Sequence, residues 1–129
     1  MLSLKVEGQG YIDIMPESIV AFEEVVSGSL EDSPNAKCSV YFDIGEGLNL
    51  AHVENSYDVI KNVVKNMTFE VNTAGETSRR VTIPRGSIVY RQSVEGSEES
   101  EAFTLIKFKL GGSISSLPVK ETREELNLI

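Results

Sequence analysis

The 129-residue chain has no tryptophan, a single cysteine (Cys38), a single histidine (His52) and no arginine before Arg79. One cysteine cannot build an internal disulfide framework or a multi-cysteine metal site, which favours a reducing compartment and predicts a cytoplasmic protein. No apolar run approaches the ~20 residues that a membrane-spanning helix needs, and residues 1–7 alternate in polarity, unlike a signal peptide. Apolar residues make up 40% and charged residues 25% of the chain. This composition excludes a disordered tail and fits a globular protein.

Acidic residues outnumber basic ones, and the net charge is −8. Residues 1–66 hold four lysines and no arginine against eleven acidic residues, a net charge of −7. Residues 67–129 hold three lysines and five arginines against nine acidic residues, a net charge of −1. A uniformly acidic surface repels phosphate, but the charge here is divided unequally between the halves, and all five arginines lie in the second half.

Four short patterns recur in the same order, displaced by between 65 and 69 residues. Their first copies are residues 2–6, 18–20, 40–45 and 53–60, and their second copies are residues 67–71, 87–89, 106–111 and 119–126. Internal repetition at a fixed period indicates repeated structure. We interpret the chain as two related units, residues 1–66 and 67–129, joined near Asn66 and packed as one compact body.

Polarity alternates with a period of two within each unit, which is typical of half-buried strands. In the first unit the predicted strands are residues 2–6, 11–14, 19–26, 37–44 and 48–53, with a loop over 27–36. Within the fourth strand we expect Val40, Phe42 and Ile44 to point inward. Short strands joined by tight turns predict a mainly β protein: a small, strongly bent antiparallel sheet or barrel built from two five-strand units.

A short helix is predicted to close each unit. In the first unit Asn55 or Ser56 caps it, and the expected apolar stripe consists of Val59, Ile60, Val63 and Val64. In the second unit Thr122 and Glu125 have the spacing of a capping box. Each unit is therefore expected to contain five strands followed by a terminal helix.

The sequence contains no constellation that an enzyme would need. Glycines at residues 45–47 and 111–112 lie between predicted strands, where a hairpin turn accounts for them better than a phosphate-binding loop. Cys38 and His52 could form a thiolate–imidazole pair, but a cysteine in an apolar strand more often packs as a small hydrophobic residue. We therefore predict a non-catalytic protein without a cofactor or a metal site.

The most informative polar feature is the basic segment over residues 79–85, which contains Arg79, Arg80 and Arg85. Lys107 and Lys109 share the outward face of another predicted strand. If these strands are neighbours, the five side chains form a basic patch suited to phosphate. The alternative is neutralisation across the strands by Glu70, Glu76 and Glu95.

Residues 41–53 read Tyr-Phe-Asp-Ile-Gly-Glu-Gly-Leu-Asn-Leu-Ala-His-Val, and this segment resembles the core of Sm/LSm proteins. In that family an aromatic–Asp pair on one strand and a hydrophobic–Asn–hydrophobic triplet on the next build a nucleotide pocket. The matching residues here are Phe42-Asp43 and Leu48-Asn49-Leu50. The resemblance implies a small Sm-like barrel whose copies form a homo-oligomeric ring by pairing edge strands.

These observations predict a non-catalytic Sm-like protein that binds single-stranded RNA or DNA as a ring and does not enter a membrane. Base contacts would come from Tyr41, Asp43 and Asn49. Contacts to the nucleic-acid backbone would come from Arg79, Arg80, Arg85, Lys107 and Lys109. The alternative is a structural or protein-interaction module, such as a phage assembly or host-interaction factor, that binds no nucleic acid.

A second resemblance is to short FlbD/SwrD-type bacterial and phage proteins. It is based on the outline Pro-x-Ser-Ile at residues 16–19 and Val-x-x-Ser-x-x-Val-Ile at residues 53–60. This resemblance implies a phage or bacterial origin and no particular activity.

Overall fold

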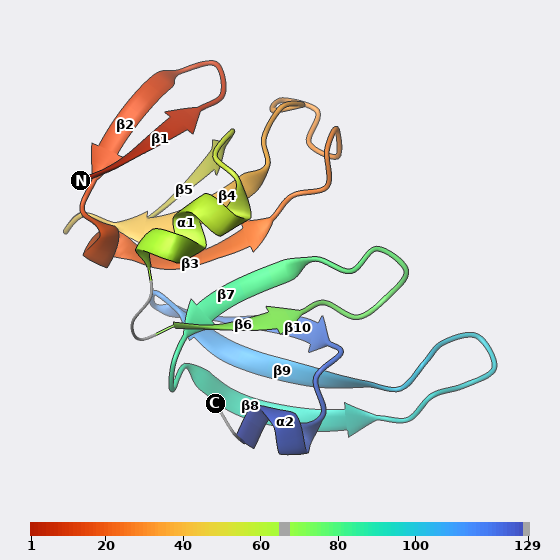
Figure 1. The fold of residues 1–129 in the computed structure, drawn as a ribbon. Helices are drawn as coiled ribbons and strands as arrows, with labels where there is room; N and C mark the ends of the chain where they lie inside the picture. Colours follow the sequence, from red (N-terminus) through yellow and green to blue (C-terminus); the bar gives the residue numbers. More distant parts are fainter. Residues whose placement is uncertain (65–67, 128–129) are drawn as a thin grey trace.

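The computed structural model describes residues 1–64 and 68–127, and within them the chain is mainly β (Figure 1). The elements of the first half are β1 (Leu2–Val6), β2 (Gly10–Ile14), the 3-10 helix η1 (Pro16–Ser18), β3 (Ile19–Glu24), β4 (Cys38–Asp43), β5 (Leu48–Val53) and α1 (Tyr57–Val63). Those of the second half are β6 (Thr68–Asn72), β7 (Arg80–Pro84), β8 (Ile88–Val94), β9 (Phe103–Leu110), β10 (Ser113–Val119) and α2 (Arg123–Asn127). The predicted order of five strands and a helix thus occurs twice, although the predicted junction near Asn66 lies outside the described residues.

The strands form two antiparallel sheets, with the orders β2-β1-β5-β4-β3-β7-β6 and β10-β9-β8. The pairing within the first half is matched in the second: β1 pairs with β2 and β5, while β6 pairs with β7 and is linked to β10 by the bridge Thr73↔Val119. Likewise, β4 lies between β3 and β5, and β9 lies between β8 and β10. The prediction of a mainly β, antiparallel fold is confirmed.

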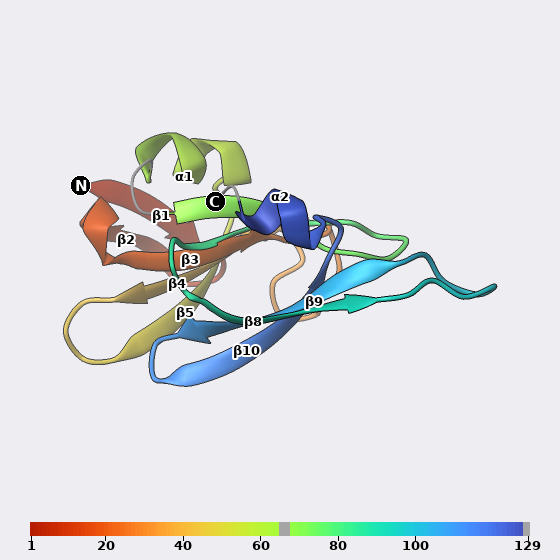
Figure 2. The ribbon, with the colours of Figure 1, turned by 90° about the horizontal axis from the view of Figure 1, so that it is seen from below.

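The predicted barrel is not closed in the described part of the chain. Closing the first half would require β3 to pair with β2, the strand at the other end of its own set. Instead β3 pairs with β7 of the second half, at Phe22↔Thr82 and Glu23↔Val81. This pairing joins the halves edge to edge, and because the bridge Thr73↔Val119 links β6 to β10, it leaves β2 and β8 as the outermost strands. Both helices, α1 and α2, lie on the same side of the strands (Figure 2).

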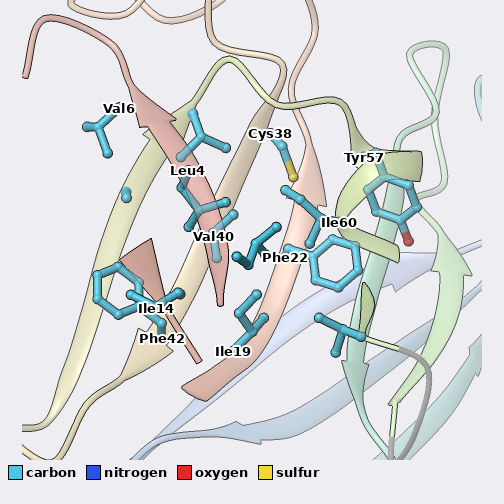
Figure 3. Packing of buried hydrophobic residues seen from close by; sticks show 14 residues of the cluster. Leu4, Val6, Ile14, Ile19, Phe22, Cys38, Val40, Phe42, Tyr57 and Ile60 are labelled. Atoms are coloured by element: carbon cyan, nitrogen blue, oxygen red, sulfur yellow. The ribbon is translucent and has the colours of Figure 1, made fainter. Parts of the chain in front are cut away.

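Each half has its own hydrophobic core. The first core lies between the strands of the first half and α1 (Figure 3), and its most deeply buried side chains are Leu4, Phe22, Val40, Val53 and Ile60. The second core is formed by β6, β7, β9, β10 and α2, and it includes Phe69, Val71, Ile83, Ile106, Phe108 and Leu126. None of the described helices is long and apolar enough to cross a membrane.

Two expectations about the strands need correction. The third strand ends at Glu24 rather than at residue 26. The fourth strand ends at Asp43, so Ile44 lies in the following turn and is 56% exposed, whereas Val40 and Phe42 are buried as predicted. Alternation continues to residue 44 in the sequence, but positive backbone φ angles at Gly45 and Gly47 already bend the chain there.

The helix caps follow the predicted chemistry more closely than the apolar stripe does. Ser56 caps α1, with its side chain accepting from the amide of Val59, and Thr122 and Glu125 bond reciprocally at 3.1 and 3.2 Å. The stripe, however, is Tyr57, Ile60 and Val64, while Val59 and Val63 are exposed. The helix begins at Tyr57, and its large ring sets which face turns toward the core.

Candidate functional site

The most strongly paired polar cluster joins the two halves. Arg79 Nη1 lies 3.2 Å from Glu23 Oε2, Arg80 Nε lies 2.7 Å from Glu24 Oε2, and Arg80 Nη1 lies 2.7 Å from Asp58 Oδ1. Hydrogen bonds from Asp58 and Glu24 raise the pKa of the Arg80 guanidinium above its ordinary value. We call these five residues the seam cluster, because every ion pair in it connects the second half to the first.

Tyr57 completes the contact between the halves. Its hydroxyl hydrogen-bonds Thr82 on β7, its ring lies 4.9 Å from that of Phe22, and the Arg80 guanidinium lies 4.4 Å from its ring centroid. Burial is the main cause that raises the pKa of the Tyr57 phenol. Sequence reasoning missed this residue, and the available signal was an aromatic residue directly after the helix cap.

The two strands of the predicted basic patch, β7 and β9, are not neighbours. The strand that carries Arg80 pairs with β6 and β3, whereas Lys107 and Lys109 lie on β9 in the other sheet. The carboxylates that neutralise Arg79 and Arg80 come from the first half, not from Glu70, Glu76 and Glu95 as the alternative expected. Glu70 instead pairs with Lys61 at 2.8 Å. Strand alternation within one unit could not reveal partners 56 residues away.

The residues of the Sm-like motif lie opposite each other on β4 and β5, at Asp43↔Leu48 and Phe42↔Asn49. Adjacent pairs point to opposite faces of a sheet, so Tyr41 and Asp43 share one face and Asn49 lies on the other. Asp43 Oδ1 accepts from the amide of Gly45 at 2.8 Å, and Asn49 Nδ2 donates to the carbonyl of Gly47 at 3.3 Å. Both polar side chains therefore stabilise the β4–β5 turn.

The two lysines of β9 lie on the outer face of the three-stranded sheet. In the strand register, Lys107 lies opposite Tyr90 on β8 and Ser116 on β10. Its Nζ lies 5.1 Å from the Tyr90 ring centroid. Lys109 is exposed and pairs with the exposed Ile114. No ion pair to either lysine is found in the described part of the chain. Arg85 is exposed in the turn between β7 and β8, and this turn adjoins β9, because the amide of Lys109 donates to the carbonyl of Ser87 at 2.9 Å.

A groove with a volume of about 870 Å³ lies between the loop after β6 and the loop that joins β8 to β9. Its charged lining residues are Glu76, Glu98, Glu99, Glu101 and Lys120. Four carboxylates against one ammonium group disfavour a phosphate ligand. Residues 1–64 and 68–127 contain no group of three or more metal-ligating side chains.

Cys38 and His52 do not form the pair considered above. Cys38 is fully buried in the first core, where burial first, and then the charges of Glu23 and Glu24, raise the pKa of its thiol to about 12. His52 instead lies opposite Ser39, with Nδ1 2.8 Å from the serine hydroxyl oxygen. This geometry is that of a structural thiol.

The outer strands β2 and β8 each pair with one other strand only within the described residues. Both strands expose large side chains: Tyr11 is 70% exposed on β2, and Val89 and Tyr90 are 51% and 44% exposed on β8. An edge strand presents unpaired backbone donors and acceptors to which another strand can add.

Comparison of the chain with protein-family models, curated proteins and solved structures finds no match.

Proposed function

We propose that the protein is a non-catalytic structural module whose copies assemble through the free edges of their sheets. The observation that carries this proposal is that the two halves of the chain are already joined in this way, by the β3–β7 pairing and the seam cluster. A module that uses edge pairing internally, and has two further open edges, is suited to growth by the same contact.

The side chains of the open edges support this proposal. Natural proteins usually protect edges with proline, inward charges or covering loops. Here β8 is seven residues long, and Val89 and Tyr90 are exposed on it. The arginines that favoured a nucleic-acid partner, Arg79 and Arg80, are bound to carboxylates at the seam.

Proline at Ser93 tests edge assembly. The amide of Val25 donates to Lys37, so in β3 the amides of Phe22 and Glu24 point toward β7. The corresponding amide in β8 is that of Ser93, because Glu24 pairs with Cys38 and Ser93 pairs with Thr104 at matching positions. Ser93→Pro thus removes a donor that the protein's own sheet does not use.

We expect light scattering to give the wild-type protein a mass that is a multiple of 14.2 kDa and to give Ser93→Pro the monomer mass. Loss of one edge hydrogen bond, which leaves its carbonyl partner unsatisfied, costs about 1–3 kcal/mol and corresponds to an affinity roughly 5- to 150-fold weaker. Ser93→Ala, which keeps the amide, is the control and should assemble normally. A wild-type protein that is still monomeric at a concentration of about 100 μM, which is on the order of the dissociation constant of a weak complex, contradicts the proposal.

A second candidate function is binding of single-stranded nucleic acid on the outer face of β8, β9 and β10. The observation that favours it is the Lys107–Tyr90 contact beside Lys109, because an aromatic ring can stack on a base while ammonium groups contact the phosphates. This proposal retains Lys107 and Lys109 from the sequence-based set and does not need Arg79 or Arg80.

Fluorescence anisotropy with labelled single-stranded RNA and DNA tests this candidate. Lys107→Glu/Lys109→Glu should weaken binding at least ~10-fold, and the affinity of the wild-type protein should fall with salt by a logarithmic slope of about −0.7 per phosphate neutralised. Lys37→Glu/Lys120→Glu changes the net charge equally at exposed positions elsewhere. Equal weakening by both double variants, or no binding at low salt, excludes this face as the site.

A further inference from the structure

The two edge strands can be compared residue by residue with the strands that meet at the seam. In β3 the register shifts between Ile19 and Ala21, and in β8 it shifts at the same place, between Ile88 and Tyr90. Ile19 pairs with Phe42, and Ile88 pairs with Phe108. Counting along both strands from this shared irregularity places Arg91 of β8 where β3 has Phe22.

The other edge strand, β2, corresponds to β7 in the same way. Directly after β2 the amide of Ser18 donates to Met15 at 2.9 Å, and directly after β7 the amide of Ser87 donates to Pro84 at 3.2 Å. Counting back from these matching turns places Asp13 of β2 where β7 has Thr82. It also places Tyr11 where β7 has Arg80.

Matching hydrogen bonds from the first strand of each half, β1 and β6, support this alignment. The amide of Lys5 on β1 donates to Asn55 Oδ1 at 2.8 Å, and the amide of Asn72 on β6 donates to Glu121 Oε1 at 2.8 Å. The structure thus shifts the first match of the sequence repeat by two residues, so that Leu4 corresponds to Val71. An even shift keeps the same side chains facing the core, which is why alternation alone could not detect it.

The helices complete the comparison. Tyr57 and Arg123 are the first residues of α1 and α2, each directly after its cap. At the seam the Arg80 guanidinium of β7 lies on the Tyr57 ring of α1, at 4.4 Å. At the open edges the same two positions are occupied by Tyr11 and Arg123, so the aromatic and the cationic partner are exchanged.

A second pair of corresponding positions, one on each open edge, carries opposite charges. The seam pair Phe22↔Thr82 corresponds to Arg91 on β8 and Asp13 on β2. Arg91 Nη1 also donates to the backbone carbonyl oxygen of Arg123 at 3.4 Å, which places the Arg91 side chain on the α2 side of β8. A cation on one edge therefore matches a carboxylate on the other, and a guanidinium matches an exposed aromatic ring.

We propose that a second copy of this chain binds head to tail, with β8 and α2 of one copy against β2 of the next, so that Arg91 faces Asp13 and Arg123 lies on Tyr11. This contact rests on the edge assembly proposed above and names its direction and register. It places the acidic first half of one copy (net charge −7) beside the second half of another (net charge −1), whereas pairing of two β2 edges would bring two acidic halves together. A head-to-tail contact repeats into a ring or an open fibre.

Single-cysteine variants distinguish the direction of assembly. Asp13→Cys and Arg91→Cys place thiols at positions that face each other only between different copies. Cys38 gives little background because it is fully buried. Under mild oxidation we expect disulfide-linked dimers only when the two variants are mixed, and a ladder of multimers from the double variant. Val59→Cys, at an exposed position on α1, serves as the control for random collisions.

The outcomes separate this inference from the function on which it rests. Dimers formed by either variant alone indicate symmetric edge pairing, which overturns the head-to-tail contact but leaves edge assembly in place. A wild-type protein that is multimeric in light scattering, with no cross-link in any mixture, overturns the register. A monomeric wild-type protein overturns both proposals.

Charge reversal gives a second measurement that does not depend on disulfide formation. Asp13→Arg or Arg91→Asp should each weaken assembly about 10-fold or more, because each places like charges opposite one another. The double variant Asp13→Arg/Arg91→Asp restores opposite charges and should recover most of the affinity. Failure of the double variant to recover, while circular dichroism shows both single variants to be folded, contradicts the Arg91–Asp13 contact.

Discussion

Replacement of Tyr57 by alanine is expected to lower the free energy of unfolding by about 3–5 kcal/mol, the range for removing a large buried aromatic side chain. Tyr57 is 2% exposed, and its ring contacts Phe22 in the first core. The same side chain hydrogen-bonds Thr82 and lies under Arg80. Its loss therefore weakens one core and the contact between the halves at once.

Urea denaturation followed by circular dichroism measures this effect. Tyr57→Phe is the matched control, because it keeps the ring and removes only the hydroxyl; leaving Thr82 without that partner should cost about 1–3 kcal/mol. If alanine and phenylalanine destabilise the protein equally, the ring contributes little and the packing argument is wrong.

Replacement of Phe108 by alanine should cost a similar amount, about 3–5 kcal/mol, but in the second core. Phe108 on β9 is 6% exposed and belongs to the cluster that contains Ile83, Ile106 and Leu126. Because the two hydrophobic clusters are separate, its effect should add to that of Tyr57→Ala within about 0.5 kcal/mol.

The double variant Tyr57→Ala/Phe108→Ala tests this independence by the same urea titration. Lys109→Ala, at an exposed position next to Phe108 on β9, should change stability by less than about 0.5 kcal/mol and controls for a general effect on the strand. A coupling energy above about 1 kcal/mol would show that the two cores act as one.

Much of the fold could be predicted because it depends on local patterns. Alternation in residues 2–6 and 48–53 gave the bounds of β1 and β5 as observed. The capping box of Thr122 and Glu125 forms with both of its hydrogen bonds. These features depend on residues close together in the sequence, whose geometry is set by strand pleating and helix-end chemistry.

The seam could not be predicted in this way. Alternation shows which face of β3 is buried but not which strand lies beside it, so the β3–β7 pairing and the open barrel were not foreseeable. That pairing also determines the partners of Arg79 and Arg80, because it brings the two arginines into ion pairs with Glu23 and Glu24. The sequence alone therefore predicts that Arg79 and Arg80 are available to a ligand, whereas their carboxylate partners lie in the other half of the same chain.

The buried thiol has a consequence for following the protein's motions. Cys38 lies in the first core, and the matching position of the second half is Thr104, since these residues pair with Val53 and Val119. Burial raises the thiol pKa to about 12, so a thiol reagent at neutral pH can attack only after the first half has opened. The rate of labelling therefore times the opening of one half of a repeated structure, while the other half contributes no signal.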